Sequence, residues 1–113
     1  MSNRILRVNE LIQKELGQII LREIEFPKNT LVTITRVETS PDLSQSKVYV
    51  SCLPDNQGDR ILQILKRQSY YIQHKFNKKL ETKIIPRIRF VKELKTMQAG
   101  KIEQILDKIK KKD

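Results

Sequence analysis

LVTITRVETSPDLSQSKVYVSCL, residues 31–53, consists of two runs rich in β-branched and aromatic residues on either side of a compact turn. Residues of these types suit a pleated, half-buried surface. In the turn, Pro41 restricts φ, and the side chains of Asp42 and Ser44 can bond the nearby backbone. The stretch therefore predicts a β-hairpin, and no other part of the chain gives so strong a strand signal.

The two predicted strands differ in how regularly apolar residues alternate. In the second strand Val48, Val50 and Cys52 share one face, which predicts one buried face and one face in water. In the first strand Ile34 and Val37 have opposite parity. This irregularity indicates either a β-bulge or contacts on both faces of the strand.

Two long helical patterns flank the hairpin. Residues 4–25 carry apolar side chains at the spacing of one helical stripe, and Gly17 within them is a position where another element can approach closely. Residues 60–80 carry a second stripe that Gln68 and Ser69 interrupt. Two polar residues at mid-length favour a bend or a helix–turn–helix break at that point.

The C-terminal part of the chain contains two shorter patterns. Residues 84–91 alternate between apolar and basic side chains and predict a third strand, in which Pro86 favours an edge position because it has no N–H to donate. Residues 99–111 have apolar residues at helical spacing and lead into a run of lysines. We expect a short basic helix there.

The predicted order is helix, two strands, two helices and a strand, followed by the short C-terminal helix. It defines an α+β domain in which helices cover one face of a three-stranded sheet. With 113 residues the chain has room for one domain, which we place at residues 1–91, and for a partly helical basic extension at residues 92–113. No apolar run approaches the roughly 18 residues of a membrane span, so we expect a cytoplasmic protein that is not embedded in a membrane.

The net charge of +10 predicts a partner that is a polyanion: nucleic acid first, then an anionic membrane or an acidic protein. The charge is concentrated, because residues 66–89 contain eight basic residues and one acidic residue. Within them Tyr71 lies in a row that presents cations to phosphates and one ring to a base. The row consists of Arg67, Tyr71, His74 and Lys78, with Lys75 and Lys79 beside it. An ordinary solvated basic face is the alternative.

Catalysis finds little support in the sequence. Cys52 is the single cysteine and lies on the apolar side of its strand, where a small buried hydrophobe is the usual role. His74 is the single histidine, so one chain cannot build a Cys/His metal cluster. The three glycines are far apart and form no phosphate-binding loop. We therefore predict no enzymatic activity, no cofactor and no small-molecule substrate.

The chain resembles the bacterial ribosome-binding factor A family from about Arg7 to Ile102. The specific part of the resemblance is residues 37–44, VETSPDLS, followed by residues 47–51, KVYVS. Three departures accompany it. The acidic-Ser signature usual after the third strand is replaced by residues 93–95, ELK. Family members have Ala-x-Gly at the bend between the second and third helices, where this chain has residues 68–70, QSY, and a usual arginine one turn later is Gln73 here.

The resemblance implies a type II KH-like fold without the Gly-x-x-Gly loop of true KH domains. It also implies a cytoplasmic assembly factor that binds the immature small ribosomal subunit and its rRNA and assists late maturation, including processing of the rRNA 5′ end. We expect such a protein to act as a monomer. The candidate RNA-binding residues are Arg4, Arg7, Arg67, His74, Lys75, Lys78, Lys79, Arg87 and Arg89. The alternative is a protein-interaction module that binds an acidic partner through a sheet edge or the basic tail.

Overall fold

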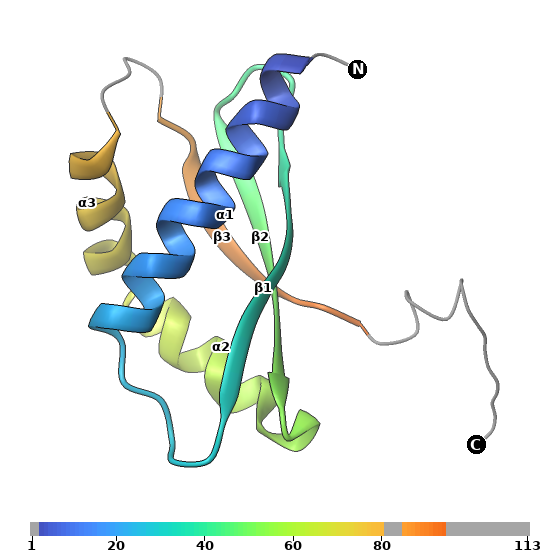
Figure 1. The fold of residues 1–113 in the computed structure, drawn as a ribbon, viewed down its shortest axis with the longest axis vertical. Helices are drawn as coiled ribbons and strands as arrows, with labels where there is room; N and C mark the ends of the chain where they lie inside the picture. The colour runs from blue at the N-terminus through green and yellow to red at the C-terminus, as the bar shows by residue number, and fades with distance from the viewer. Residues whose placement is uncertain (1–2, 81–84, 95–113) are drawn as a thin grey trace, which may run out of the picture.

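The computed structural model describes residues 3–80 and 85–94. These residues form a two-layer α+β domain, in which three helices lie on one side of a mixed sheet (Figure 1). The sheet order is β1-β2-β3, with β1 antiparallel and β3 parallel to β2. The elements are α1 (Asn3–Glu23), β1 (Leu31–Thr39), β2 (Gln45–Leu53), the short 3₁₀ helix η1 (Asp55–Gln57), α2 (Gly58–Arg67), α3 (Ser69–Lys79) and β3 (Arg87–Lys92). The predicted fold class is confirmed.

The predicted hairpin is formed by β1 and β2. Its register shifts between Ile34 and Arg36, so the irregular alternation of the first strand is a β-bulge at Thr35. In the turn, the side chain of Asp42 accepts a hydrogen bond of 3.0 Å from the backbone N–H of Ser44. Leu43 has a φ of 63° and a buried side chain, so the turn buries an apolar residue in addition to its polar contacts.

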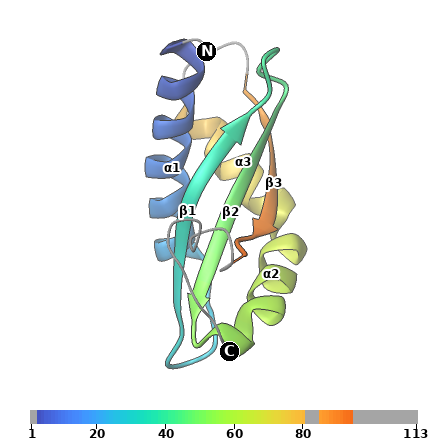
Figure 2. The same ribbon diagram turned by 90° about the vertical axis from the view of Figure 1, so that its right-hand side faces the viewer.

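The core lies between the helices and one face of the sheet. Val48 and Val50 of β2 point into it and are 0% and 3% exposed. Figure 2 shows that the described helices leave the opposite face of the sheet uncovered. The helices supply the buried residues Ile12, Leu16, Ile19 and Ile20 from α1, Ile61 and Leu65 from α2, and Ile72 and Phe76 from α3.

The interruption at Gln68 is a bend between two adjoining helices. Gln68 has φ −94° and ψ 8°, outside the helical range, yet its N–H donates to Ile64 and its carbonyl accepts from Ile72. The backbone hydrogen bonds therefore continue through the bend, and α3 changes direction without a connecting loop (Figure 1).

The third strand begins later than the sequence predicted. Ile85 and Pro86 lie outside β3, and residue 84 is outside the described residues. At the start of the strand, the side chain of Gln73 donates to the Pro86 carbonyl and accepts from the N–H of Ile88 at 2.8 Å. A side chain of α3 thus occupies the outer edge of β3, which is an edge strand as Pro86 predicted.

The close approach expected at Gly17 is wrong, because a Cβ built on this glycine would meet nothing within 4 Å. A polar contact ties α1 to the hairpin instead: Asn9 and Ser46 both lie within hydrogen-bond distance of the Thr39 hydroxyl, at 2.6 and 2.8 Å.

Among the described residues, no helix is long and apolar enough to cross a membrane. The helix predicted over residues 99–111 and most of the predicted extension lie outside the described residues.

Candidate nucleic-acid interface

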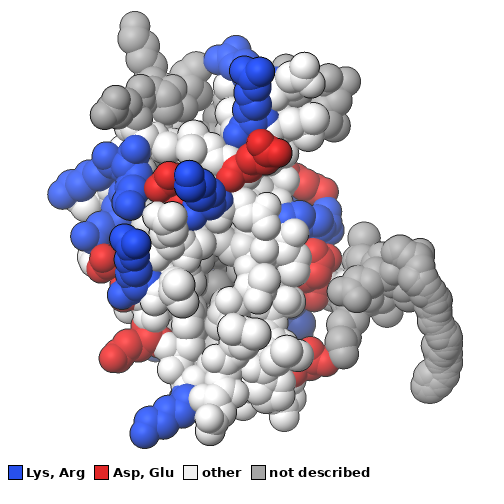
Figure 3. All heavy atoms as spheres, viewed as in Figure 1, with Lys and Arg blue, Asp and Glu red and all other residues white. Residues whose placement is uncertain are grey.

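The basic residues predicted on the second helical pattern lie mainly on α3. Ile72 and Phe76 face the core and are fully buried, so the remaining sides of this helix carry its polar and aromatic side chains. Figure 3 shows basic side chains gathered over α3 and the neighbouring part of α1, with acidic side chains among them. The surface of α3 is therefore cationic but divided, and its two sides have different neighbours.

One side of α3 faces α1. The Lys75 ammonium lies 3.9 Å from the Glu23 carboxylate, and Lys79 lies 3.8 Å from Glu15. The Tyr71 hydroxyl donates a hydrogen bond of 2.7 Å to Glu23, and this bond raises the pKa of Tyr71 above its ordinary value. Tyr71 is thus held against α1, and acidic residues offset part of the charge of both lysines.

The other side of α3 points away from α1 and carries Tyr70, His74 and Lys78, spaced by four residues and all exposed. The rings of Tyr70 and His74 are nearly parallel, with an interplanar angle of 6° and centroids 6.5 Å apart. Arg67, the last residue of α2, is exposed just before the bend. We define Arg67, Tyr70, His74 and Lys78 as the outer row of α3. The sequence predicted Tyr71 in this row, whereas the structure has Tyr70 there.

Arg87 and Arg89 lie on the face of the sheet that the described helices leave uncovered. They alternate along β3 with Ile88, which is buried on the helical side. The register pairs Arg89 with Lys47 of β2, an exposed lysine that was not among the candidates. These cations are separated from the outer row of α3 by the thickness of the sheet, so the structure does not join the two predicted patches into one.

The remaining two candidates, Arg4 and Arg7, are exposed on the first two turns of α1. The hydrogen bond between Asn9 and Thr39 places this end of α1 near the hairpin turn. Because α1 runs antiparallel to α3, as the pairs of Glu15 and Glu23 require, these arginines lie beyond the C-terminal end of α3. They form a third cationic area, at the N-terminal end of α1.

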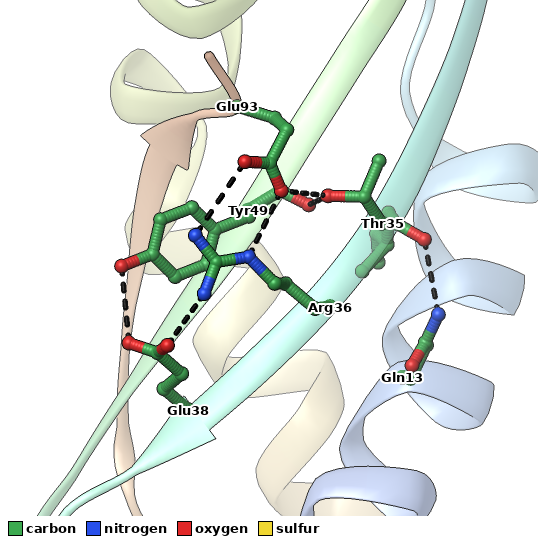
Figure 4. A network of polar contacts seen from close by, with 7 residues as sticks. Gln13, Thr35, Arg36, Glu38, Tyr49 and Glu93 are labelled. Carbon is green, nitrogen blue, oxygen red and sulfur yellow. Dashed lines mark hydrogen bonds and ion pairs between the residues drawn. The ribbon is translucent and has the colours of Figure 1, made fainter. Parts of the chain in front are cut away.

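A polar network that the sequence did not predict crosses the uncovered face of the sheet (Figure 4). Its centre is Arg36 of β1, whose guanidinium carbon lies 3.7 Å from the centroid of the Tyr49 ring. The same guanidinium donates to Glu93 at 3.0 Å and also pairs with Glu38. Thr35, the residue at the bulge, donates to Glu93 at 2.7 Å. The network connects the end of β3 with β1 across the middle strand.

Hydrogen bonds within the network favour the charged forms of Glu93 and Arg36. Burial by itself raises the pKa of Glu93, but the hydrogen bonds from Arg36 and Thr35 outweigh it, so the pKa of Glu93 lies below its ordinary value. The hydrogen bond to Glu93 raises the pKa of Arg36. Both groups are therefore charged at neutral pH, and Arg36 is engaged within the fold.

The described residues contain no cluster of metal-ligating side chains and no exposed cysteine. Among them there is no group of three or more His, Cys, Asp and Glu side chains that could hold a metal ion. Cys52 is buried, and burial is the main cause that raises its pKa, which disfavours the reactive thiolate. The geometry of the described part of the chain thus offers charged and aromatic binding surfaces.

Element order, the bend between α2 and α3, and a parallel third strand together define a KH-like α+β domain with cationic surfaces on its helices and its sheet. The sequence model of the family described as ribosome-binding factor A matches residues 4–106. The chain belongs to the ribosome-binding factor A family.

Individual relatives agree with this assignment. The ribosome-binding factor A of Nitrosococcus oceani is 32% identical over 112 residues, which cover 98% of this chain and 88% of the relative. The protein of the same name from Chlamydia abortus is 36% identical over 115 residues, covering 99% and 96%. Both alignments span nearly the whole of each chain, so the similarity is not confined to the hairpin.

Solved structures give the same result for the fold. The solution NMR structure of a Thermotoga maritima ribosome-binding factor A has a TM-score of 0.66 and 32% identity, covering 78% of this chain and 85% of that one. A homology model of the Thermus thermophilus ribosome-binding factor A, fitted into a cryo-EM map of its 30S complex, has a TM-score of 0.63 and 24% identity, covering 74% of this chain and 88% of that one.

Proposed function

We propose that this chain is a non-enzymatic assembly factor that binds the immature small ribosomal subunit through rRNA phosphates and assists late maturation, including processing of the rRNA 5′ end. Membership of the ribosome-binding factor A family is the observation that carries the proposal. The Thermus thermophilus relative fitted into a 30S complex supports the choice of the small subunit. In this proposal the protein acts in the cytoplasm as a monomer, without a cofactor or a small-molecule substrate.

The proposed contact surface has two parts. The first is α3, where Lys78 and the other lysines present ammonium groups to phosphates, with Arg67 at the adjoining end of α2. The second is the strip of Arg87 and Arg89 on the uncovered face of the sheet, and Arg4 and Arg7 extend the surface along α1. Since Lys75 and Lys79 already lie near carboxylates of α1, we expect them to contribute less per residue than Lys78. In this proposal residues 92–113 are the basic extension, although Lys92 ends β3 and Glu93 accepts a hydrogen bond from Arg36.

Sedimentation tests the choice of partner. The protein should comigrate with free small subunits in a sucrose gradient and be absent from assembled ribosomes. Replacing Lys75, Lys78 and Lys79 with Gln should weaken this association, and replacing Arg87 and Arg89 with Gln gives the matched test of the sheet. Glutamine is preferable to glutamate because a carboxylate at residue 75 or 79 would face Glu23 or Glu15. Comigration of both folded variants at wild-type levels would contradict the proposed surface.

Maturation is tested in cells. Depletion of the protein should lead to small subunits whose rRNA carries an unprocessed 5′ end, measured by primer extension, and expression of this chain should reverse the defect. Purified protein incubated with labelled precursor rRNA should leave it intact. Cleavage by the purified protein, absent from a mock purification, would contradict the non-enzymatic part of the proposal.

The alternative is a module that binds an acidic protein through a sheet edge or the basic tail. Two contacts argue against the sheet edges: Gln73 occupies backbone groups of β3, and Gln13 of α1 donates to the Ile34 carbonyl of β1 at 3.0 Å. A salt titration separates the two functions. Contact with several phosphates should give a log–log slope of about −0.7 to −0.9 per phosphate neutralised, and a flat slope would favour a protein partner.

A further inference from the structure

Tyr70 is a large aromatic residue that the fold does not use. It lies in the first turn of α3, next to the bend at Gln68, and is 86% exposed. The core positions of this helix are filled by Ile72 and Phe76. Packing within the domain does not explain why a ring of this size is exposed at this helical position.

The other two tyrosines of the chain, Tyr49 and Tyr71, are held by contacts within the fold. The Tyr49 ring is covered by Arg36, and its hydroxyl donates to Glu38. Tyr71 is held against α1 by its hydrogen bond to Glu23. Tyr70 instead lies parallel to another exposed ring, with an angle of 6° and a centroid distance of 6.5 Å. That ring belongs to His74, one helical turn further along.

Two parallel exposed rings within a row of cations have the features of a single-stranded RNA site. Bases stack on aromatic faces, and cations along the same surface hold the backbone phosphates. Arg67 precedes the ring pair by three residues and Lys78 follows it by four, and both are exposed. The net charge of +10 favours a polyanion over a protein as the partner of this surface.

We infer that Tyr70 and His74 form a stacking platform for an unpaired rRNA nucleotide, whose neighbouring phosphates contact Arg67 and Lys78. This inference rests on the proposed function, since it specifies what the protein contacts on the small subunit.

The direct test uses a single-stranded hexanucleotide RNA that contains one 2-aminopurine, whose fluorescence falls when it stacks on a ring. Wild type and Tyr70→Phe should quench the probe and bind it alike, whereas Tyr70→Leu should bind roughly five- to 150-fold more weakly and not quench it. Tyr71→Leu is the matched control, because it removes the neighbouring ring that faces α1, and it should retain the quenching. A fully paired RNA duplex should be bound equally by wild type and Tyr70→Leu.

Pelleting with purified small subunits completes the test. Tyr70→Leu should lose at least fivefold in affinity and Tyr70→Phe should match wild type, with circular dichroism confirming that both fold. If Tyr70→Leu pellets and quenches like wild type, the platform is refuted and the proposed function stands. If wild type quenches the probe but does not pellet, the proposed function fails and the platform stands. Loss of pelleting by Tyr70→Leu without any quenching by wild type would assign the ring to a ribosomal protein and refute the platform.

Discussion

Replacing Glu93 with Gln should lower the free energy of unfolding by about 1–3 kcal/mol at neutral pH. The Glu93 side chain is 7% exposed and accepts hydrogen bonds from Arg36 at 3.0 Å and Thr35 at 2.7 Å. Breaking a fully buried ion pair costs about 3–5 kcal/mol, and surface pairs contribute about 0–1 kcal/mol. Because the Arg36 side chain is 37% exposed, solvent screens the pair in part and the expected loss falls between these limits.

Glu38 provides a matched control on the same guanidinium. Its side chain is 53% exposed, so Glu38→Gln should cost less than about 1 kcal/mol although it removes an ion pair with the same Arg36. Urea unfolding followed by circular dichroism measures both variants. In thermal unfolding, a loss of 2 kcal/mol from Glu93→Gln corresponds to roughly 10 °C for a domain of this size.

The pH dependence of Glu93→Gln identifies the cause of its effect. The pKa of Glu93 is lowered in the folded protein, so the stabilisation by the ion pair is complete above the ordinary value of 4.5 and is lost as the pH falls through the folded pKa. The difference between wild type and Glu93→Gln should be constant from about pH 7 to pH 5.5 and shrink below about pH 4.5. A difference under about 0.5 kcal/mol at neutral pH, or one that does not change in acid, would refute the reasoning.

Three further substitutions test other parts of the fold. Gly17→Ala should raise the free energy of unfolding by about 0.5–1 kcal/mol in urea, because an added Cβ meets open space within α1. Asp42→Asn should lower the melting temperature, since the hydrogen bond from the Ser44 hydroxyl is the main cause that lowers the pKa of Asp42 from 3.8 to about 2, and this stabilisation is lost as pH falls from 3.8 through 2. Gln73→Ala should accelerate hydrogen exchange at the Ile88 amide, measured by NMR, because it removes the acceptor of that N–H.

Elements with local sequence signals could be predicted from the sequence. Opposite parity of Ile34 and Val37 indicated an irregular first strand, and the structure has a bulge at Thr35 because hydrogen-bonded pairing resumes only at Arg36. The bend at Gln68 was predicted from a local change in polarity. The pair of Arg36 and Glu93 could not be predicted, because 57 residues separate its members and both the β1–β2 pairing and the parallel pairing of β3 with β2 are needed to bring them together.

The sequence alone could not determine whether Tyr70 or Tyr71 belongs to the candidate site, because the answer depends on how the helices pack. One ring lies three residues and the other four residues after Arg67, and both spacings are compatible with one face of a helix. The packing of α1 against α3 determines which ring is exposed. The Tyr71 hydroxyl donates a hydrogen bond to Glu23 of α1, whereas Tyr70 is exposed. The same acidic side of α1 offsets charge on Lys75. The proposed binding surface of α3 therefore lies on its outer row, where the cations and the Tyr70 ring are exposed.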